Sequence, residues 1–155
     1  MLLKFKKKIN NILSFFTKKT VNIISDYIPE YKTDGSACFD FVSTETHLFT
    51  KNELFNLGTG VRCEIPDGWC MLVFSRSSLG QKKIIIPNSV GVIDSDYRGE
   101  IKVPLISLND CPVLIEKGTR VAQGMLIKVT KAKFIKCDIL SDTDRGVGGF
   151  GSTGR

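Results

Sequence analysis

The segment "PNSVGVIDSDYRGEI", residues 87–101, holds three side chains with distinct chemical uses. Asn88 has a planar amide that offers a donor beside an acceptor, which matches a ring edge with a carbonyl next to an N–H, as in uracil. Asp94 follows an apolar stretch, and a carboxylate at the end of a strand can hold a water molecule and take its proton. Tyr97 adds a flat ring that can pack against a sugar. On spacing alone, the segment also fits an ordinary β-hairpin with an aspartate-rich turn.

A second candidate site is the stretch "FSRSSLG", residues 74–80, in which a strand runs into one arginine and two serines. A guanidinium group, serine hydroxyls and a backbone amide beside Gly80 are the donors from which a phosphate cradle is built. Taken alone, the pattern also fits a polar turn that follows a strand.

Two polar residues interrupt otherwise apolar strands. Asp40 lies between two phenylalanines, where it fits either a place near a metal ion or a hydrogen bond to a turn. Gln123 lies inside "RVAQGMLIKV", residues 120–129, and considered alone it favours a core strand with one satisfied polar residue. The chain then ends in "RGVGGFGSTGR", residues 145–155, which has five glycines, two arginines, one phenylalanine and no acid. This end fits a loose tail or a lid over a nucleotide.

The elements that must position these residues are short. Apolar stretches of four to ten residues, rich in Val, Ile and Phe, are separated by Gly, Pro, Asn and Asp, which is typical of a many-stranded barrel or sandwich. No helix is expected after residue 20. The expected strands fall at residues 21–25, 38–43, 60–66, 69–75, 83–89, 101–107, 113–118, 120–129 and 134–140.

The charge of the chain is concentrated at its beginning. The net charge is +6, and residues 1–25 contain six lysines and no acid, so the remainder of the 155 residues is formally neutral. The basic character therefore belongs to an N-terminal arm, and we expect no nucleic acid partner for the main domain. The length predicts one domain with a small appendage.

The five cysteines argue against metal binding and against secretion. They are odd in number, lack a C-x-x-C pair and accompany a single histidine, His47, so a Cys/His zinc site is not expected. Buried free thiols in a reducing compartment are the expectation. There is no apolar run of membrane-spanning length, and a secretory signal is not expected, because the lysine-rich beginning lacks an uninterrupted apolar core. The sequence predicts a cytoplasmic protein, or one inside the nucleus or a virus-infected host cell.

The N-terminal arm has apolar residues at helical spacing, with steps of three and four residues from Leu2 to Phe16. It predicts a short basic amphipathic helix. Contact with a membrane surface, a targeting peptide, a partner-binding helix and a loosely packed extension all remain open. The chain is divided accordingly into residues 1–20 as the arm, residues 21–144 as a β domain, and residues 145–155 as a C-terminal arm.

Five motifs, taken in order, resemble those of the trimeric dUTP nucleotidohydrolase (dUTPase) family. They are "GSACFDF", "SRSSLG", "GVIDSDYRGEI", "RVAQGMLIKV" and "RGVGGFGSTGR", and the resemblance covers residues 22–155. It implies a distorted all-β jelly roll, or β-clip fold, in a homotrimer whose active sites are shared between subunits. It also implies Mg²⁺-assisted hydrolysis of dUTP to dUMP and diphosphate, which limits uracil in DNA and supplies dUMP for dTMP synthesis.

The resemblance assigns roles to individual positions. Asp94 is expected to activate the water that attacks the α-phosphorus, and Tyr97 to stack on the deoxyribose. Mg²⁺ is expected on the phosphates of the substrate, with Asp40 reaching it through water. Phe150 is expected to cover the uracil. The expected substrate-binding residues are Arg76, Ser77, Ser78, Gly80, Asn88, Gly91, Val92, Tyr97, Gln123, Arg145, Phe150, Gly151 and Ser152.

The motifs depart from the family pattern at four positions that carry no proposed chemistry: Cys38, Phe39, Ser75 and Gly124. Two alternatives to a dUTPase remain. One is a dCTP deaminase-like or bifunctional enzyme of the same fold, which needs a glutamate base. The other is a non-catalytic, nucleotide-sensing regulatory module. Asp94 at the base position favours the dUTPase.

Overall fold

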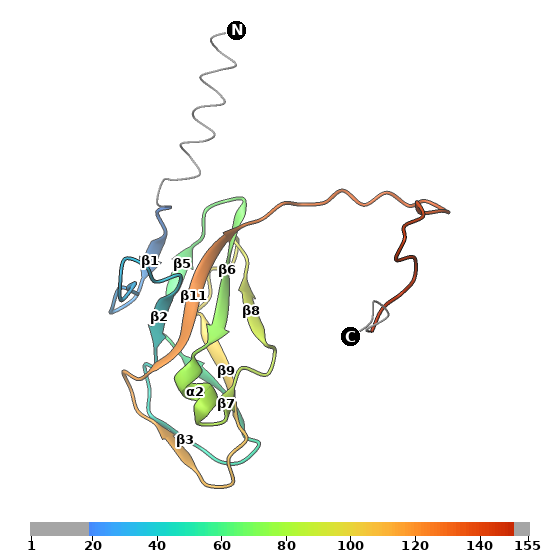
Figure 1. The fold of residues 1–155 in the computed structure, drawn as a ribbon. Helices are drawn as coiled ribbons and strands as arrows, with labels where there is room; N and C mark the ends of the chain where they lie inside the picture. The colour runs from blue at the N-terminus through green and yellow to red at the C-terminus, as the bar shows by residue number, and fades with distance from the viewer. Residues whose placement is uncertain (1–18, 151–155) are drawn as a thin grey trace, which may run out of the picture.

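The computed structural model describes residues 19–150 (Figure 1). The predicted helix of the N-terminal arm lies outside the described residues, as do Gly151 and Ser152. The division of the chain near residues 20 and 144 therefore stays a prediction.

Eleven β-strands and one short helix form the described chain. In order they are β1 (Asn22–Ile24), β2 (Phe39–Val42), β3 (His47–Phe49), β4 (Leu54–Gly58), β5 (Arg62–Glu64), β6 (Trp69–Ser75), α2 (Ser77–Gln81), β7 (Ile84–Ile85), β8 (Val90–Ile93), β9 (Lys102–Ser107), β10 (Val113–Ile115) and β11 (Arg120–Lys128).

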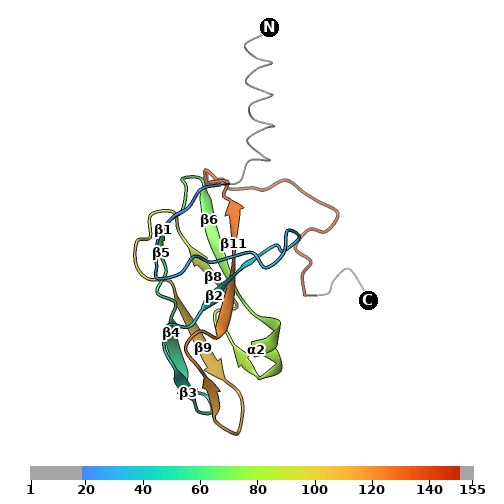
Figure 2. The ribbon, with the colours of Figure 1, turned by 90° about the vertical axis from the view of Figure 1, so that its left-hand side faces the viewer.

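The strands pair only in antiparallel fashion, in four sheets among the described residues. The largest has the order β2-β11-β6-β8, and a second has the order β4-β9-β7. The two-stranded sheets β1-β5 and β3-β10 complete the layers, and Figures 1 and 2 show them wrapped around one interior. The all-β class predicted from the sequence is confirmed.

Alternation along the strands decides which side chains reach the core. In β2, Phe39 and Phe41 are buried while Asp40 and Val42 point to the opposite face. In β9, Val103 and Leu105 are fully buried. The polar residue in the middle of β2 is therefore turned away from the core and toward the surface of the sheet.

Several sequence predictions need correction. The stretch after Arg76 forms helix α2, although no helix was expected there, and residues 134–140 form no strand. Cys111 and Cys137 are exposed, although buried thiols were expected, and all five cysteines are free. Within residues 19–150, no helix is long and apolar enough to cross a membrane.

Two of the departures from the family pattern fit each other in space. Gly124 in β11 lies opposite Phe39 in β2, and a Cβ atom on Gly124 would lie 2.6 Å from the Phe39 ring and 2.8 Å from the Phe41 ring. The two rings also pack edge to face, with centroids 5.5 Å apart. The two aromatic rings of β2 therefore leave room only for glycine at position 124 of β11.

We expect Gly124→Ala to lower the free energy of unfolding by about 1–3 kcal/mol, because the added methyl group overpacks the core. Chemical denaturation measures this change. Phe39→Leu in the same chain should recover part of the loss, because the smaller side chain clears the space. Equal losses with and without the Phe39 change would contradict this account of the packing.

Candidate active site

A pocket of about 340 Å³ collects the polar residues of the first, second and fourth motifs. Asp40 comes from β2, Arg76 from the junction of β6 and α2, and Gln123 from β11. These strands adjoin in the four-stranded sheet, which is why residues up to 83 positions apart in the sequence meet there. The remaining lining residues are Lys32, Ser36, Ala37, Cys38 and Arg120. We call this the cationic pocket.

Asp40 is the anchor of the cationic pocket. Its Oδ1 lies 2.9 Å from Nε of Arg76, and its Oδ2 lies 3.0 Å from Nη1 of Arg120. Only 14% of the Asp40 side chain is exposed, compared with 21% of Arg76 and 44% of Arg120, so the pair with Arg76 is the more shielded of the two. Two guanidinium groups against one carboxylate leave this cluster with a net positive charge, which suits an anionic ligand.

The side-chain amide of Gln123 forms a hydrogen bond between strands: its Nε2 donates to the carbonyl of Ser75 over 3.0 Å. The bond connects β11 to the residue before Arg76.

Cys38 also lines the cationic pocket, and burial and the charge of Asp40 raise the pKa of its thiol. The thiol therefore stays protonated at neutral pH and adds no negative charge to the cationic pocket.

The hydroxyls of the second motif are exposed on α2 beside Arg76. Leu79 is buried and fixes the short helix to the core, while Ser77 and Ser78 face solvent. Arg76 donates from Nη1 to Oγ of Ser78 at 3.5 Å. A Cβ atom on Gly80 would meet nothing within 4 Å, so the surface here is open for a ligand to approach the backbone.

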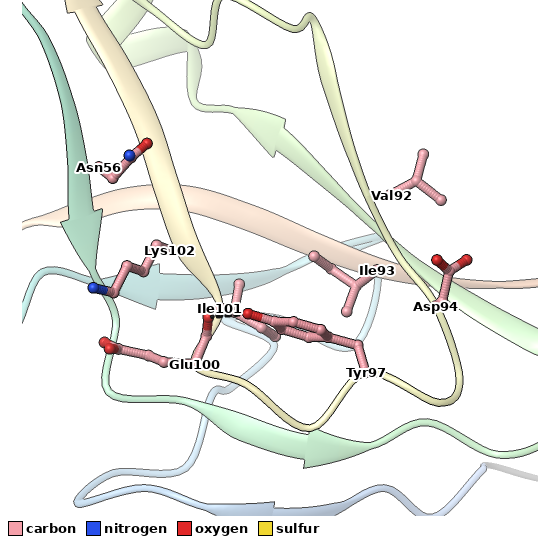
Figure 3. Close-up of a pocket in the computed structure, with 8 residues that line it drawn as sticks. All are labelled: Asn56, Val92, Ile93, Asp94, Tyr97, Glu100, Ile101 and Lys102. Atoms are coloured by element: carbon pink, nitrogen blue, oxygen red, sulfur yellow. Dashed lines mark hydrogen bonds between the residues drawn. The ribbon is translucent and has the colours of Figure 1, made fainter.

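A second pocket, of about 370 Å³, contains the third motif (Figure 3). Val92, Ile93, Asp94 and Tyr97 line it together with Asn56, Glu100, Ile101 and Lys102. Asp94 is exposed immediately after β8, as the sequence predicted. We call this the Asp94 pocket. Its lining combines acidic, aromatic and aliphatic side chains with one amide and one lysine.

The ring of Tyr97 is held in place by its own turn. Its hydroxyl donates to the carbonyl of Glu100 over 3.0 Å, and its backbone N–H donates to the carbonyl of Asp94 over 3.2 Å. The ring lies against Gly99, where a Cβ atom would stand 2.3 Å from the hydroxyl oxygen. Gly99 is therefore required for this ring position, which sequence reasoning missed.

The strand that leads to Asp94 lies at the edge of its sheet. β8 is the edge strand of its sheet and pairs on one side with β6, so its other edge has no partner strand among residues 19–150. Gly91 faces Val73, where an added Cβ would lie only 3.3 Å from that side chain. Asn88 is exposed in the turn before β8, beside Ser89 with its left-handed φ of 64°. The β-hairpin that spacing alone allowed over residues 87–101 does not form, because β8 pairs with β6 while β9 pairs with β4 and β7.

The predicted site residues are not all brought together within one chain. The two pockets share no lining residue, so Asp94 and Tyr97 are separated from Arg76 and Gln123. The C-terminal segment leaves the domain after β11 (Figures 1 and 2). Phe150 is fully exposed there, and Arg145 donates from Nε to the nearby Gly148 carbonyl.

A comparison with protein families decides which of the candidate activities this arrangement serves. The dUTPase family model matches residues 26–154, which is most of the chain and includes both pockets. The chain belongs to the dUTPase family. The match leaves out residues 1–25, which carry the six lysines of the N-terminal arm.

Curated relatives of this dUTPase are named deoxyuridine 5'-triphosphate nucleotidohydrolase. One from Helicobacter pylori is 41% identical over 128 residues, covering 82% of this chain and 88% of the relative. One from Nautilia profundicola is 44% identical over 129 residues, covering 83% and 91%. The family predicted from the five motifs is confirmed.

Solved dUTPase structures share the fold. The crystal structure of dUTPase from Streptococcus mutans is 28% identical, with a TM-score of 0.68 over 75% of this chain and 100% of that one. The G164S mutant of the Staphylococcus bacteriophage 80alpha dUTPase, solved with dUpNHpp, gives a TM-score of 0.80 over 89% of this chain and 100% of that one. At 23% identity the second likeness shows the fold alone. The predicted jelly-roll fold is confirmed.

Sequence reasoning missed part of both pockets. Asn56 enters the Asp94 pocket from β4, far from the third motif in sequence, because β4 pairs with β9. Lys102 enters from the start of β9, directly after the motif ends. Arg120 enters the cationic pocket next to a predicted site residue, and its position at the start of the fourth motif was the one available signal.

Proposed function

We propose that this protein hydrolyses dUTP to dUMP and diphosphate. The observation that carries the proposal is the chemistry of its two pockets: a carboxylate beside a ring in one, and two guanidinium groups held by a single carboxylate in the other. A nucleoside triphosphate needs both environments, because it joins a neutral base and sugar to a strongly anionic chain.

In the proposed reaction, Asp94 orients a water molecule and accepts its proton as the oxygen attacks the α-phosphorus. The bond from the α-phosphorus to the bridging oxygen breaks, and diphosphate leaves. The open edge of β8 and the amide of Asn88 read the uracil, while Tyr97 packs on the deoxyribose. Arg76, Ser77, Ser78 and the backbone near Gly80 hold the phosphates, with Gln123 beside them.

Mg²⁺ fits this site as a companion of the substrate. Within residues 19–150 no group of three or more His, Cys, Asp or Glu residues is placed to hold a metal ion. The one carboxylate of the cationic pocket, Asp40, already has both oxygens in ion pairs. Mg²⁺ keeps several waters and binds readily to phosphate oxygens, so it would be held by the triphosphate, with Asp40 in reach only through water. When bound, it neutralises part of the phosphate charge.

The separation of the two pockets supports a homotrimer with shared active sites. One chain supplies the Asp94 pocket, and another supplies the cationic pocket. The segment after β11 supports the same assembly, because Phe134, Ile135, Ile139 and Leu140 are 76–93% exposed there. Four large, exposed apolar side chains within seven residues favour burial against another copy of the chain. The mass of the protein in solution tests this assembly.

The test of the activity uses the purified full chain with dUTP and Mg²⁺. We expect release of diphosphate and dUMP, with little turnover of dCTP, dTTP or UTP. Ammonia released from dCTP would instead support the deaminase alternative. Binding of dUTP without turnover would support a regulatory module.

We expect Gly99→Ala to reduce kcat/KM for dUTP about 10–100-fold, because misplacing a positioning group by about 1 Å can cost about 10²-fold. The added Cβ would overlap the Tyr97 hydroxyl and push the ring out of the Asp94 pocket. The discrimination against UTP should fall at the same time, since the ring is proposed to exclude a 2′-hydroxyl.

Gly118→Ala is the matched control for this change, because Gly118 lies in a turn outside both pockets with open space around its Cβ position. It alters stability through its positive φ but should leave the ratio of dUTP to UTP turnover unchanged. An unchanged ratio in Gly99→Ala would contradict the role given to the ring.

A further inference from the structure

Strand β11 enters its sheet through a β-bulge opposite β2. Gln123 pairs with Asp40, and Arg120 pairs with Val42, so β11 advances three residues where β2 advances two. Asp40 and Val42 are two residues apart and lie on one face of the sheet. The extra residue in β11 therefore turns Arg120 onto the same face as Gln123, which regular alternation would not do.

The burial of the residues in the bulge agrees with this reading. Val121 and Ala122 are consecutive, yet both are completely buried, whereas neighbours in a regular strand alternate between the two faces. Bulges next to functional sites commonly re-aim a side chain. Here the side chain that is re-aimed is Arg120, which lines the cationic pocket.

Arg120 is connected to Arg76 in two ways, through a shared carboxylate and through a direct hydrogen bond. Through its side chain, Arg120 binds one oxygen of Asp40 at 3.0 Å, while Arg76 binds the other at 2.9 Å. Through its backbone, the carbonyl of Arg120 accepts a hydrogen bond from Nη1 of Arg76 over 3.3 Å. Within residues 19–150, none of these contacts uses Nη2 of Arg76.

We propose that Arg120 is a positioning residue of the phosphate site, which fixes the guanidinium of Arg76 through Asp40 and through its own carbonyl. The proposal rests on the proposed function, in which Arg76 holds a substrate phosphate. An arginine side chain has many rotamers, so fixing it before the substrate arrives reduces the entropy lost on binding. The Nη2 side of the Arg76 fork is left for a phosphate oxygen.

A positioning role and a direct contact with the substrate predict different results when both arginines are changed. If Arg120 acts by positioning Arg76, removing its side chain should matter only while Arg76 is present. If Arg120 itself binds phosphate, the two arginines should contribute independently. A double-mutant cycle measures that difference.

The experiment compares Arg120→Gln, Arg76→Gln and the double variant with the unaltered full chain. We expect Arg120→Gln to lower kcat/KM for dUTP about 10–100-fold, as for other losses of positioning, and to weaken inhibition by inorganic triphosphate. In the Arg76→Gln background, the same change should alter kcat/KM less than about twofold. Arg120→Lys keeps the charge but loses the planar fork, and it should recover only part of the activity.

Lys51→Gln is the matched control, because it removes one positive charge and breaks an exposed ion pair with Asp110 outside both pockets. Independent effects in the double variant would overturn the positioning role, as would an Arg120→Gln protein that hydrolyses dUTP and binds triphosphate like the parent. Inorganic triphosphate keeps this outcome separate from the proposed function, because its binding reports on the cationic pocket even if dUTP is not the substrate.

Discussion

Asp94→Asn should reduce kcat for dUTP about 10²–10⁴-fold, the range that a positioned general base contributes. The carboxylate is exposed at the end of β8 and lines the pocket that also holds Tyr97. An asparagine has nearly the same shape but cannot accept the proton of the attacking water. The dissociation constant for a non-hydrolysable dUTP analogue should therefore change much less than kcat. Single-turnover kinetics and equilibrium binding measure the two quantities separately.

Asp96→Asn is the matched control, because it makes the same chemical change two residues away, at an exposed position outside both pockets. It should retain most of the activity. Similar losses in both variants would indicate a general effect of charge in this turn rather than a base at Asp94. An Asp94→Asn protein with nearly full turnover would show that the water is activated by another group.

The sequence predicted strands well where alternation and breakers agree. The expected strand at residues 69–75 coincides with β6, which is long, apolar and follows a glycine turn. β3 and β4 were missed, because each is short and contains a polar residue, His47 in one and Asn56 in the other. Their existence depends on pairing with β10 and β9 far along the chain, which local pattern does not encode.

The sequence motifs predicted which residues belong to the site, but not which of them lie next to one another in the folded chain. Asp94 and Tyr97 are close in sequence, so their shared pocket follows from one turn. Arg120 reaches Asp40 across 80 residues, and only because a bulge changes its face. Strand alternation would place Arg120 on the face opposite Gln123. The bulge arises from the pairing of β11 with β2, so a tertiary contact, rather than local sequence, decides which polar residues meet.

Residues 134–140 were expected to form a strand, but they do not pair with any strand in the described part of the chain. The segment has the composition of a strand, yet it lies exposed beyond β11 in the single chain. Apolar periodicity reports that a segment should be buried, but it does not report which molecule buries it. In the proposed trimer, this segment packs against another subunit. A single chain therefore cannot bury it.

Truncation after Asp144 should lower kcat/KM about 10²–10⁴-fold while leaving the β domain folded. The removed segment contains Phe150, proposed to stack on the uracil for about 1–3 kcal/mol. It also contains Arg145, whose charge-assisted bonds to phosphate are worth about 1.5–3 kcal/mol. The hydrogen bonds described for residues 145–150 connect only residues 143–148, so this part of the segment has no hydrogen bond to the sheets. Steady-state kinetics and thermal unfolding measure the two effects.

Deletion of residues 1–18 provides the matched control, because it shortens the other end of the chain in a region outside the family match. That variant should keep its activity, whereas the C-terminal truncation should not. Phe150→Ala and Arg145→Gln then divide the effect: loss of stacking should weaken binding of dUMP and dUTP alike, and loss of the guanidinium should weaken dUTP more. Ordering a flexible lid over the substrate costs conformational entropy, so a working lid must stabilise the transition state by more than that cost. A truncated protein with full activity would therefore show that the glycine-rich end takes no part in the reaction.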